Sequence, residues 1–250
     1  MIRGMYSSTS NLLSLMRQQE VLSHNLSNMN TPGFKQLVVP TREAGELALT
    51  PNAGGSASGS IGMLPMGVNS SESLVDYTQG PLEATDRPLD LAILGDGFFR
   101  VQTPQGERLT RNGTFHRDAA GNLCNADGFF LLGENGPIQI GLGTPTIMGD
   151  GNIYMPGEEQ PTARVALVQV NNFGALTADD NGLIDAGNAG VQVMAGTETN
   201  MKQGFREQAN VDLGGTMVNM MRALRSYEAT QRTFQIQDQT LQQLMDVGRA

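Results

Sequence analysis

The residues best suited to acid–base or nucleophilic chemistry are few, and none lies in a catalytic setting. The chain has two histidines, His24 in a predicted helix and His116 in a predicted strand. Neither is near a Gly-x-Ser-x-Gly elbow, the turn that exposes a nucleophilic serine. Cys124, the only cysteine, is interpreted as a structural thiol and excludes an internal disulfide or a cysteine-rich metal site. The sequence therefore predicts no catalytic residue and no enzyme.

Two segments resemble binding loops but lack essential parts. Oxygen-bearing residues alternate from Thr177 toward Gly182, as in a calcium loop, but the twelfth position is Asn188 and not the bidentate glutamate that such loops need. The glycines Gly95 and Gly97 lack the third glycine and the following helix of a dinucleotide site. We expect no metal, no cofactor and no small-molecule substrate.

The distribution of charge argues against binding to nucleic acid. Residues 1–36 carry +2, residues 37–204 carry −11 and residues 205–250 are neutral, which gives the net charge of −9. Nucleic acid requires a basic patch, and the chain has only two lysines, Lys35 and Lys202. No apolar run approaches the roughly 20 residues that cross a bilayer, and the N-terminus shows no cleavable secretory signal. We expect no membrane insertion.

Two long amphipathic helices are predicted at the chain ends. In the first, over about 5–29, apolar residues recur at near-heptad spacing with Gln19 in the one polar slot; these residues are Leu12, Leu15, Leu22, Leu26 and Met29. In the second, from about 211 to 247, the spacing alternates between four and three, with Gln231 and Asp238 in polar slots; its apolar members are Leu213, Met217, Met220, Leu224, Tyr227, Phe234, Leu241 and Met245. A stripe with this period packs against another helix. We predict that these thirteen apolar residues form an assembly interface.

Local signals define the ends of both helices. Thr31 precedes a proline, which disfavours the helical conformation, and Pro32-Gly33 fits the centre of a type II turn. Asp212 lies near the start of the second helix, where the macrodipole favours an acid, and Gly248 can end it.

The middle of the chain has the pattern of an antiparallel β domain. Short apolar runs alternate with glycine-rich turns, and Gly95-Asp96-Gly97 between two such runs is typical of a hairpin. We predict an α+β protein with four parts: an N-terminal helix and turn (1–36), a Gly/Ser-rich connector arm (37–74), a β-rich outer domain (75–204) and a C-terminal helix (205–250). The terminal helices are expected to form a coiled-coil-like layer.

The apolar stripes allow two interpretations. The terminal helices can pack on each other within one chain, but the longer stripe exceeds what the shorter helix covers, and an exposed apolar surface usually marks an interaction site. An assembly protein is the leading interpretation. The alternatives are an oligomeric β-domain binding protein, adhesin-like or cell-wall binding, which the scarcity of aromatic residues disfavours, and a wall-degrading enzyme, for which no paired carboxylates stand out.

Several motifs resemble those of the bacterial flagellar rod and hook proteins. The sequence NLSNMNTPGFK at 25–35 is similar to the N-terminal signature of that family, and 209–229 is similar to its C-terminal helix. The motif residues are Asn25, Leu26, Asn28, Asn30, Thr31, Pro32, Gly33, Phe34, Asn210 and Val211. The segments RPLD at 87–90 and GPI at 136–138 look most like the proximal-rod member, with the distal-rod member a close second.

The resemblance implies a structural subunit of the flagellar rod. Such a subunit would assemble with copies of itself and with related rod subunits, would transmit torque, and would lie in the basal body, where the rod crosses the periplasm. It would pass through the flagellar type III export machinery without a cleaved signal. The resemblance also implies that the helices form an inner tube and the β domain an outer layer.

Overall fold

The computed structural model describes residues 2–43, 46–49, 62–65, 68–179, 182–187, 189–194 and 200–248 of the chain. Its contacts divide the chain into two units. The first, here called the helical unit, comprises Met1–Leu26, Leu37–Leu74 and Asp212–Ala250. The second, here called the body, comprises Ser27–Gln36 and Val75–Val211. The four predicted ranges (1–36, 37–74, 75–204 and 205–250) stay a prediction.

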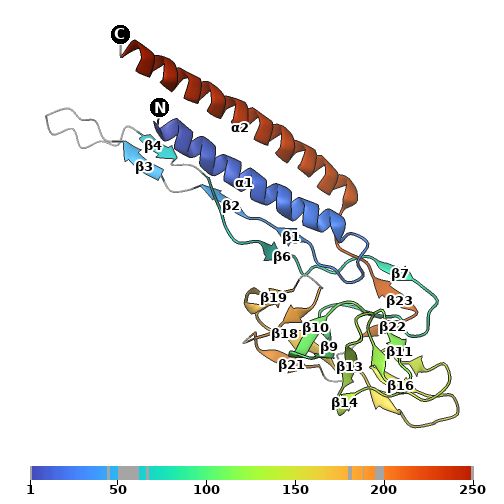
Figure 1. Ribbon diagram of the computed structural model, residues 1–250. Coiled ribbons are helices and arrows are strands. Elements are labelled where there is room, and N and C mark those ends of the chain that lie inside the picture. Colours follow the sequence, from blue (N-terminus) through green and yellow to red (C-terminus); the bar gives the residue numbers. More distant parts are fainter. Residues whose placement is uncertain are drawn as a thin grey trace. The chain divides into compact units, whose positions relative to one another are not determined.

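The helical unit contains both long helices of Figure 1. Its elements are α1 (Ile2–Ser27), β1 (Leu37–Val38), β2 (Thr41–Glu43), β3 (Glu46–Leu49), β4 (Gly62–Pro65), β5 (Val68–Ser70), β6 (Leu74–Val75, whose last residue belongs to the body) and α2 (Leu213–Val247). β2 pairs with β5 and β3 pairs with β4, both antiparallel. Much of the predicted connector arm lies outside the described residues.

Local sequence determines where α2 begins and ends. The side chain of Asp212 accepts hydrogen bonds from the backbone N–H groups of Gly214 and Gly215, so it caps the helix. The N–H of Gly248 donates to the carbonyl of Leu244 at the other end. The 35 residues of α2 correspond to roughly 52 Å. The prediction for the second helix is therefore confirmed to within two residues.

The body is built from short antiparallel strands. They are β7 (Leu82–Ala84), β8 (Leu91–Ile93), β9 (Phe98–Thr103), β10 (Gly106–Thr110), β11 (His116–Arg117), β12 (Leu123–Cys124), β13 (Phe130–Gly133), β14 (Gly136–Pro137), β15 (Thr146–Ile147), β16 (Asn152–Tyr154), β17 (Ala163–Arg164), β18 (Leu167–Val170), β19 (Thr177–Ala178), β20 (Ile184–Asp185), β21 (Val191–Val193), β22 (Met201–Gln203) and β23 (Phe205–Glu207), with one 3-10 turn at Phe173–Ala175. The predicted α+β class is confirmed.

β9 is the centre of the largest sheet. It pairs antiparallel with β10, β13 and β18, and its successive side chains point to opposite faces of the sheet. Phe98 belongs to one buried apolar cluster, whereas Phe99 and Val101 belong to the other. Both faces of β9 are therefore covered by buried apolar residues of the body.

The predicted hairpin at Gly95-Asp96-Gly97 is wrong. β8 pairs with β22, and the N–H of Leu94 donates to the carbonyl of Asn200, so the edge of β8 is occupied by a strand that follows much later in the chain. β9 pairs with β10 instead. The turn signal was local, whereas the pairing of β8 is long-range.

Candidate functional site

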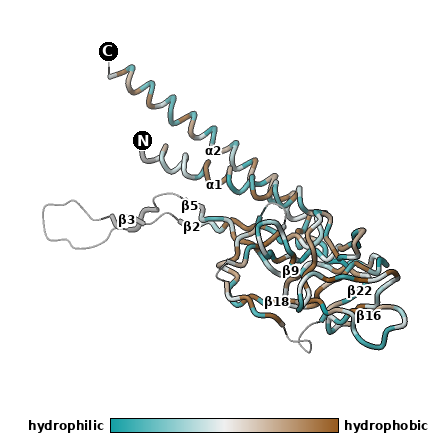
Figure 2. The backbone as a smooth tube through the Cα atoms, turned by 60° about the horizontal axis from the view of Figure 1, so that its bottom comes forward, coloured by the Kyte–Doolittle hydropathy of each residue, from teal (hydrophilic) through white to brown (hydrophobic). Residues whose placement is uncertain are grey.

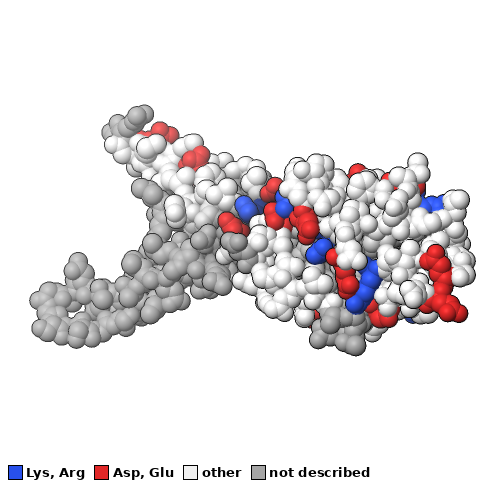
Figure 3. Space-filling view, turned by 90° about the horizontal axis from the view of Figure 1, so that it is seen from below, with Lys and Arg blue, Asp and Glu red and all other residues white. Residues whose placement is uncertain are grey.

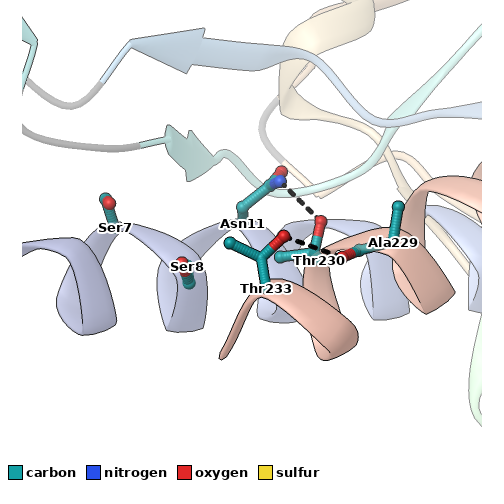
Figure 4. Close-up of a pocket in the computed structure, with 6 residues that line it drawn as sticks. All are labelled: Ser7, Ser8, Asn11, Ala229, Thr230 and Thr233. Carbon is teal, nitrogen blue, oxygen red and sulfur yellow. Dashed lines mark hydrogen bonds between the residues drawn. The ribbon is translucent and has the colours of Figure 1, made fainter. Parts of the chain in front are cut away.

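The two helices pack antiparallel through small and polar side chains. Asn11 Nδ2 of α1 donates to Thr230 Oγ1 of α2 at 3.2 Å, and Gly4 is so close to α2 that a Cβ there would lie 3.1 Å from Gln237 Nε2. Moving seven residues forward along α1, from Gly4 to Asn11, therefore corresponds to moving seven residues backward along α2, from Gln237 to Thr230. Figure 4 shows the contact at Asn11, where Ser7, Ser8, Asn11, Ala229, Thr230 and Thr233 line a groove of about 290 Å³.

The same register extends along the rest of the helix pair. It places Gln18 opposite Ala223 and Asn25 opposite Thr216. Asn25, Thr216 and Ala223 are buried. We call the α2 residues Thr216, Ala223, Thr230 and Gln237 the intrachain row. Large apolar side chains are absent from this row. Of the apolar stripe on α2, Met220, Tyr227, Phe234 and Leu241 flank the row and are half-buried, whereas Leu213, Met217, Leu224 and Met245 are exposed.

The structure places the predicted assembly residues in two groups. Those that are exposed are Leu213, Met217, Leu224 and Met245 of α2; those that are half-buried are Met220, Tyr227, Phe234 and Leu241 of α2 and Leu12, Leu15, Leu22 and Leu26 of α1. Met29 lies in the turn after α1, because the helix ends at Ser27 and not at 29 as predicted. Their role as an assembly interface stays a prediction.

Other large apolar residues of the helices are exposed and were not predicted. On α1 they are Tyr6, Leu13 and Met16, and on α2 they are Val218, Met221, Ile236, Leu244 and Val247. They occupy helix positions next to the predicted stripe, and Figure 2 shows apolar residues interspersed with polar ones along both helices. Assigning every large apolar residue to a face of its helix, and not only those in the near-heptad stripe, would have identified these residues.

The N-terminal family motif fixes the chain where α1 ends. Asn25 Nδ2 donates to the carbonyl of Leu37 and Asn25 Oδ1 accepts from its N–H, both at 2.8 Å, so this buried amide pairs with β1 as a strand would. The N–H of Phe34 donates to the carbonyl of Thr31, and Gly33 has φ +71°. The hydrogen bond and the positive φ confirm the predicted turn.

Gly33 also lies at backbone distance from two other segments of the body. A Cβ on Gly33 would lie 2.4 Å from the backbone N of Asn112, and its own N–H donates to the carbonyl of Glu207. Both the conformation and the space therefore require glycine. Phe34 follows as a buried side chain.

A buried charge cluster joins the motif to the end of the body. Lys35 Nζ lies 2.6 Å from Glu207 Oε1, and Arg111 Nη1 lies 3.3 Å from Glu207 Oε2. The Glu207 side chain is 1% exposed, and Lys35 and Arg111 are nearly as buried. Lys35 also donates to the carbonyl of Thr78, and the N–H of Gly80 donates to Glu207 Oε1. We call Lys35, Arg111 and Glu207 the charge cluster.

Burial and pairing act against each other in this cluster. Burial lowers the pKa of Lys35 and of Arg111, because removing water penalises the charged forms. The carboxylate of Glu207 opposes both shifts. Arg111 also lies with its guanidinium carbon 5.0 Å from the centre of the Phe98 ring. Sequence reasoning missed this cluster, although Lys35 is the last residue of the N-terminal segment that resembles the family.

Asn210 secures the same segment from the C-terminal side. Its Oδ1 accepts from the N–H of Gln36 at 2.7 Å, and its Nδ2 donates to the carbonyl of Asp76 at 2.9 Å. Asp76 in turn accepts from Gln36 Nε2 and from the N–H of Thr78, and these bonds lower its pKa. Segments that precede and follow the β-rich region of the body are thus held together.

The candidate chemical residues form no reactive site in the described part of the chain. Cys124 Sγ lies 3.2 Å from His116 Nε2, but burial and Asp118 raise the pKa of the thiol, the opposite of an activated nucleophile. Part of the calcium-like loop, including Asn188, lies outside the described residues. Among the described residues, no group of three or more His, Cys, Asp or Glu side chains could hold a metal ion. In Figure 3, acidic and basic side chains are interspersed across the described part of one face.

Comparison with known proteins gives a consistent match along the chain. Residues 5–35 match the model "Flagella basal body rod protein", residues 92–186 match "Flagellar hook protein FlgE/F/G D1 domain" and residues 202–247 match "Flagellar basal body rod FlgEFG protein C-terminal". The chain is 31% identical over 267 residues to the basal-body rod protein FlgG of Bacillus subtilis, with both chains fully covered. It is 31% identical to FlgF of Escherichia coli over 100% of this chain and 97% of the relative. It is 32% identical to FlgF of Caulobacter vibrioides over 92% and 91%.

Two terminal helices around a β-rich body, matched in order by these models, define a structural protein of the bacterial flagellum. The chain belongs to the flagellar basal-body rod protein family. It is a structural rod subunit located in the basal body. No helix in the described part of the chain is long and apolar enough to cross a membrane.

Proposed function

We propose that this subunit assembles with copies of itself and with other rod subunits through its terminal helices, which form a coiled-coil-like layer, and that the assembly transmits torque. One observation carries the proposal: the two contacts that define the helix pair, Asn11–Thr230 and Gly4–Gln237, join small or polar residues, while large apolar side chains of both helices, such as Leu13 and Leu224, stay exposed. Such surfaces usually mark interaction sites. Burying them against neighbours would supply the cohesion of the rod.

The charge cluster gives the proposal a mechanical basis. The chain passes between its two units four times, and Lys35, Glu207 and Asn210 hold together the segments of the body next to two of these crossings, after Gln36 and after Val211. A force applied to either helix would reach the folded body at the same point. We propose that this arrangement passes load between the helices and the body.

Further parts of the proposal rest on the family. The subunit would pass through the flagellar export machinery, would have no enzymatic activity, and would bind neither nucleic acid nor a small-molecule substrate. Its assignment as the proximal-rod rather than the distal-rod member stays a prediction. The identities to FlgG of Bacillus subtilis and to FlgF of Escherichia coli are both 31%, so identity to these two relatives does not favour either name.

The proposal is tested by placing a charge on the apolar stripe of α2, at the exposed Leu224 and at the half-buried Phe234. Leu224→Asp and Phe234→Asp are each expected to abolish rod assembly and motility in a strain whose own copy is replaced, while the purified variants keep the thermal unfolding of the body. Gln239→Asp, at an exposed polar position of α2, is the matched control and should swim normally. Normal motility of Leu224→Asp would contradict the proposal.

A further inference from the structure

The body carries a surface groove that the proposed assembly through the helices does not use. The groove has a volume of about 560 Å³ and lies between the turn after β11, the segment after β14 and the turn after β16. Ile140 and Met155 line its floor and are 3% and 7% exposed. Its rim includes Gln139, Glu158 and Thr162. The groove therefore combines an apolar floor with a polar rim.

The rim of the groove is fixed by contacts within the body. Arg117 Nη1 donates to the carbonyl of Gly141 at 2.6 Å. Gly143 has φ +130°, and a Cβ there would lie 3.3 Å from Pro156 Cγ, so the segment after β14 packs against the turn after β16. A groove whose walls are already ordered loses little conformational entropy when it binds a ligand.

One large apolar side chain is exposed at the rim. Leu142 also lines the groove and is 90% exposed, more than any other large apolar residue in the described part of the chain. A single exposed apolar residue is common on protein surfaces. This one lies beside the buried Ile140 and Met155, so it extends the apolar surface that a ligand in the groove would cover.

The charges at the groove favour a positively charged ligand. Glu158 is the only charged residue among the described residues that line it, and Glu158 Oε2 accepts from Thr162 Oγ1 at 2.6 Å. The carboxylate of Glu158 forms no ion pair within the described ranges. Glu159 and Asp118 add acidic charge within two residues of the lining, whereas the nearby cation Arg117 donates to a backbone carbonyl. A cation is therefore the complementary ligand.

We propose that this groove binds a lysine side chain presented by a partner protein. The aliphatic stem of the lysine would lie on Ile140, Met155 and Leu142, and long basic side chains bury their stems on apolar surface in this way. The ammonium group would pair with Glu158. Because Thr162 already occupies one oxygen of this carboxylate, the point charge of an ammonium fits better than the paired donors of an arginine. The contact goes beyond the proposed assembly, because it uses the body and not the terminal helices.

The site is tested on the full-length protein with two compounds that differ only in charge. N-acetyl-lysine methylamide carries the proposed side chain, and N-acetyl-norleucine methylamide carries the same stem without the ammonium group. The methyl NMR signals of Met155 and Ile140 report on the groove. The signal of Ile184, which belongs to the other buried cluster of the body, is the reference.

We expect the lysine compound to shift the Met155 and Ile140 signals until they saturate, and the norleucine compound to shift them far less at equal concentration. Glu158→Gln should weaken binding of the lysine compound by about threefold, the effect of losing one exposed ion pair. Glu134→Gln, at an exposed acid outside the groove lining, is the matched control and should bind as the unaltered protein does.

Three results would overturn the lysine site. Shifts that never saturate would show that the groove holds no ligand of this kind, and equal binding of the norleucine compound would show an apolar groove without charge recognition. Unchanged binding by Glu158→Gln would exclude the proposed ion pair. Thermal unfolding of Glu158→Gln verifies that this exposed turn residue leaves the fold intact. Because no substitution lies in α1 or α2, failure of this site leaves the proposed assembly through the helices as it stands.

Discussion

At the scale of single residues, Glu207 is a buried carboxylate whose replacement would leave buried charges without a partner. Its carboxylate is the partner of two buried cations, Lys35 and Arg111, and it also accepts from the N–H of Gly80. Removing one partner of a buried ion pair leaves uncompensated charge, which is far more costly than the loss of an exposed pair. The motif lysine therefore depends on a residue 172 positions away in the chain.

We predict that Glu207→Ala lowers the free energy of unfolding of the body by about 3–5 kcal/mol. Glu207→Gln, which keeps the shape and part of the hydrogen bonding, should lower it less. Urea unfolding followed by circular dichroism measures both. Glu134→Gln, which breaks the exposed pair with Arg164, is the control and should change stability little. Equal stability of Glu207→Ala and the unaltered protein would show that the cluster does not stabilise the body.

A second residue-scale prediction concerns acid pH. Hydrogen bonds from Gln36 and Thr78 lower the pKa of Asp76 in the folded state below its ordinary 3.8. A lowered carboxyl pKa contributes stability that is fully present above the unfolded value and is lost as the pH falls through the folded value. We expect stability to fall more steeply below about pH 4 in the unaltered protein than in Asp76→Asn, as measured by thermal unfolding at a series of pH values. Identical pH profiles would contradict this role.

At the scale of elements, the sequence predicts the helices better than their packing. Asp212 and Pro32-Gly33 act on neighbouring residues, so the helix start and the turn could be read directly. The face of α2 that packs on α1 could not be predicted in this way, because a search for large apolar residues misses small buried residues such as Ala223. The hairpin at Gly95-Asp96-Gly97 failed for a related reason: the partner of β8 lies more than one hundred residues further along the chain.

The start of α2 gives a prediction at this scale. A Cβ on Gly214 would lie 3.6 Å from Asp212 Oδ1, an ordinary contact, whereas one on Gly215 would lie 2.5 Å from Asp212 Oδ2. Gly214→Ala should therefore stabilise the start of α2 by ~1 kcal/mol. Gly215→Ala gains the same propensity but displaces the capping side chain, so its net gain should be near zero. Amide exchange of residues 216–220 compares the two variants, and equal protection would argue against the cap.

At the scale of the whole molecule, the body and the helical unit differ in the interactions that stabilise them. The body buries apolar clusters on both faces of β9 and holds its ends together through the charge cluster. The helical unit has a row of small or polar residues on α2 facing α1, and large apolar side chains of both helices that are exposed. Helices of this kind gain most of their stability from packing on other elements. We therefore predict a body that is stable in the monomer and helices that depend on neighbouring subunits for their stability.

Amide hydrogen exchange on the purified monomer tests this claim most directly. We predict slow exchange in β9, β10 and β13 of the body, and fast exchange in α1 and α2. Exchange should be fastest in residues 240–247, because the register set by Asn11–Thr230 and Gly4–Gln237 places the first residue of α1, Ile2, opposite residue 239. This result would mean that neighbouring subunits complete the helical unit. Strong protection of α2 through to Val247 in the monomer would contradict the account, because it would show that the helix is stable without neighbours.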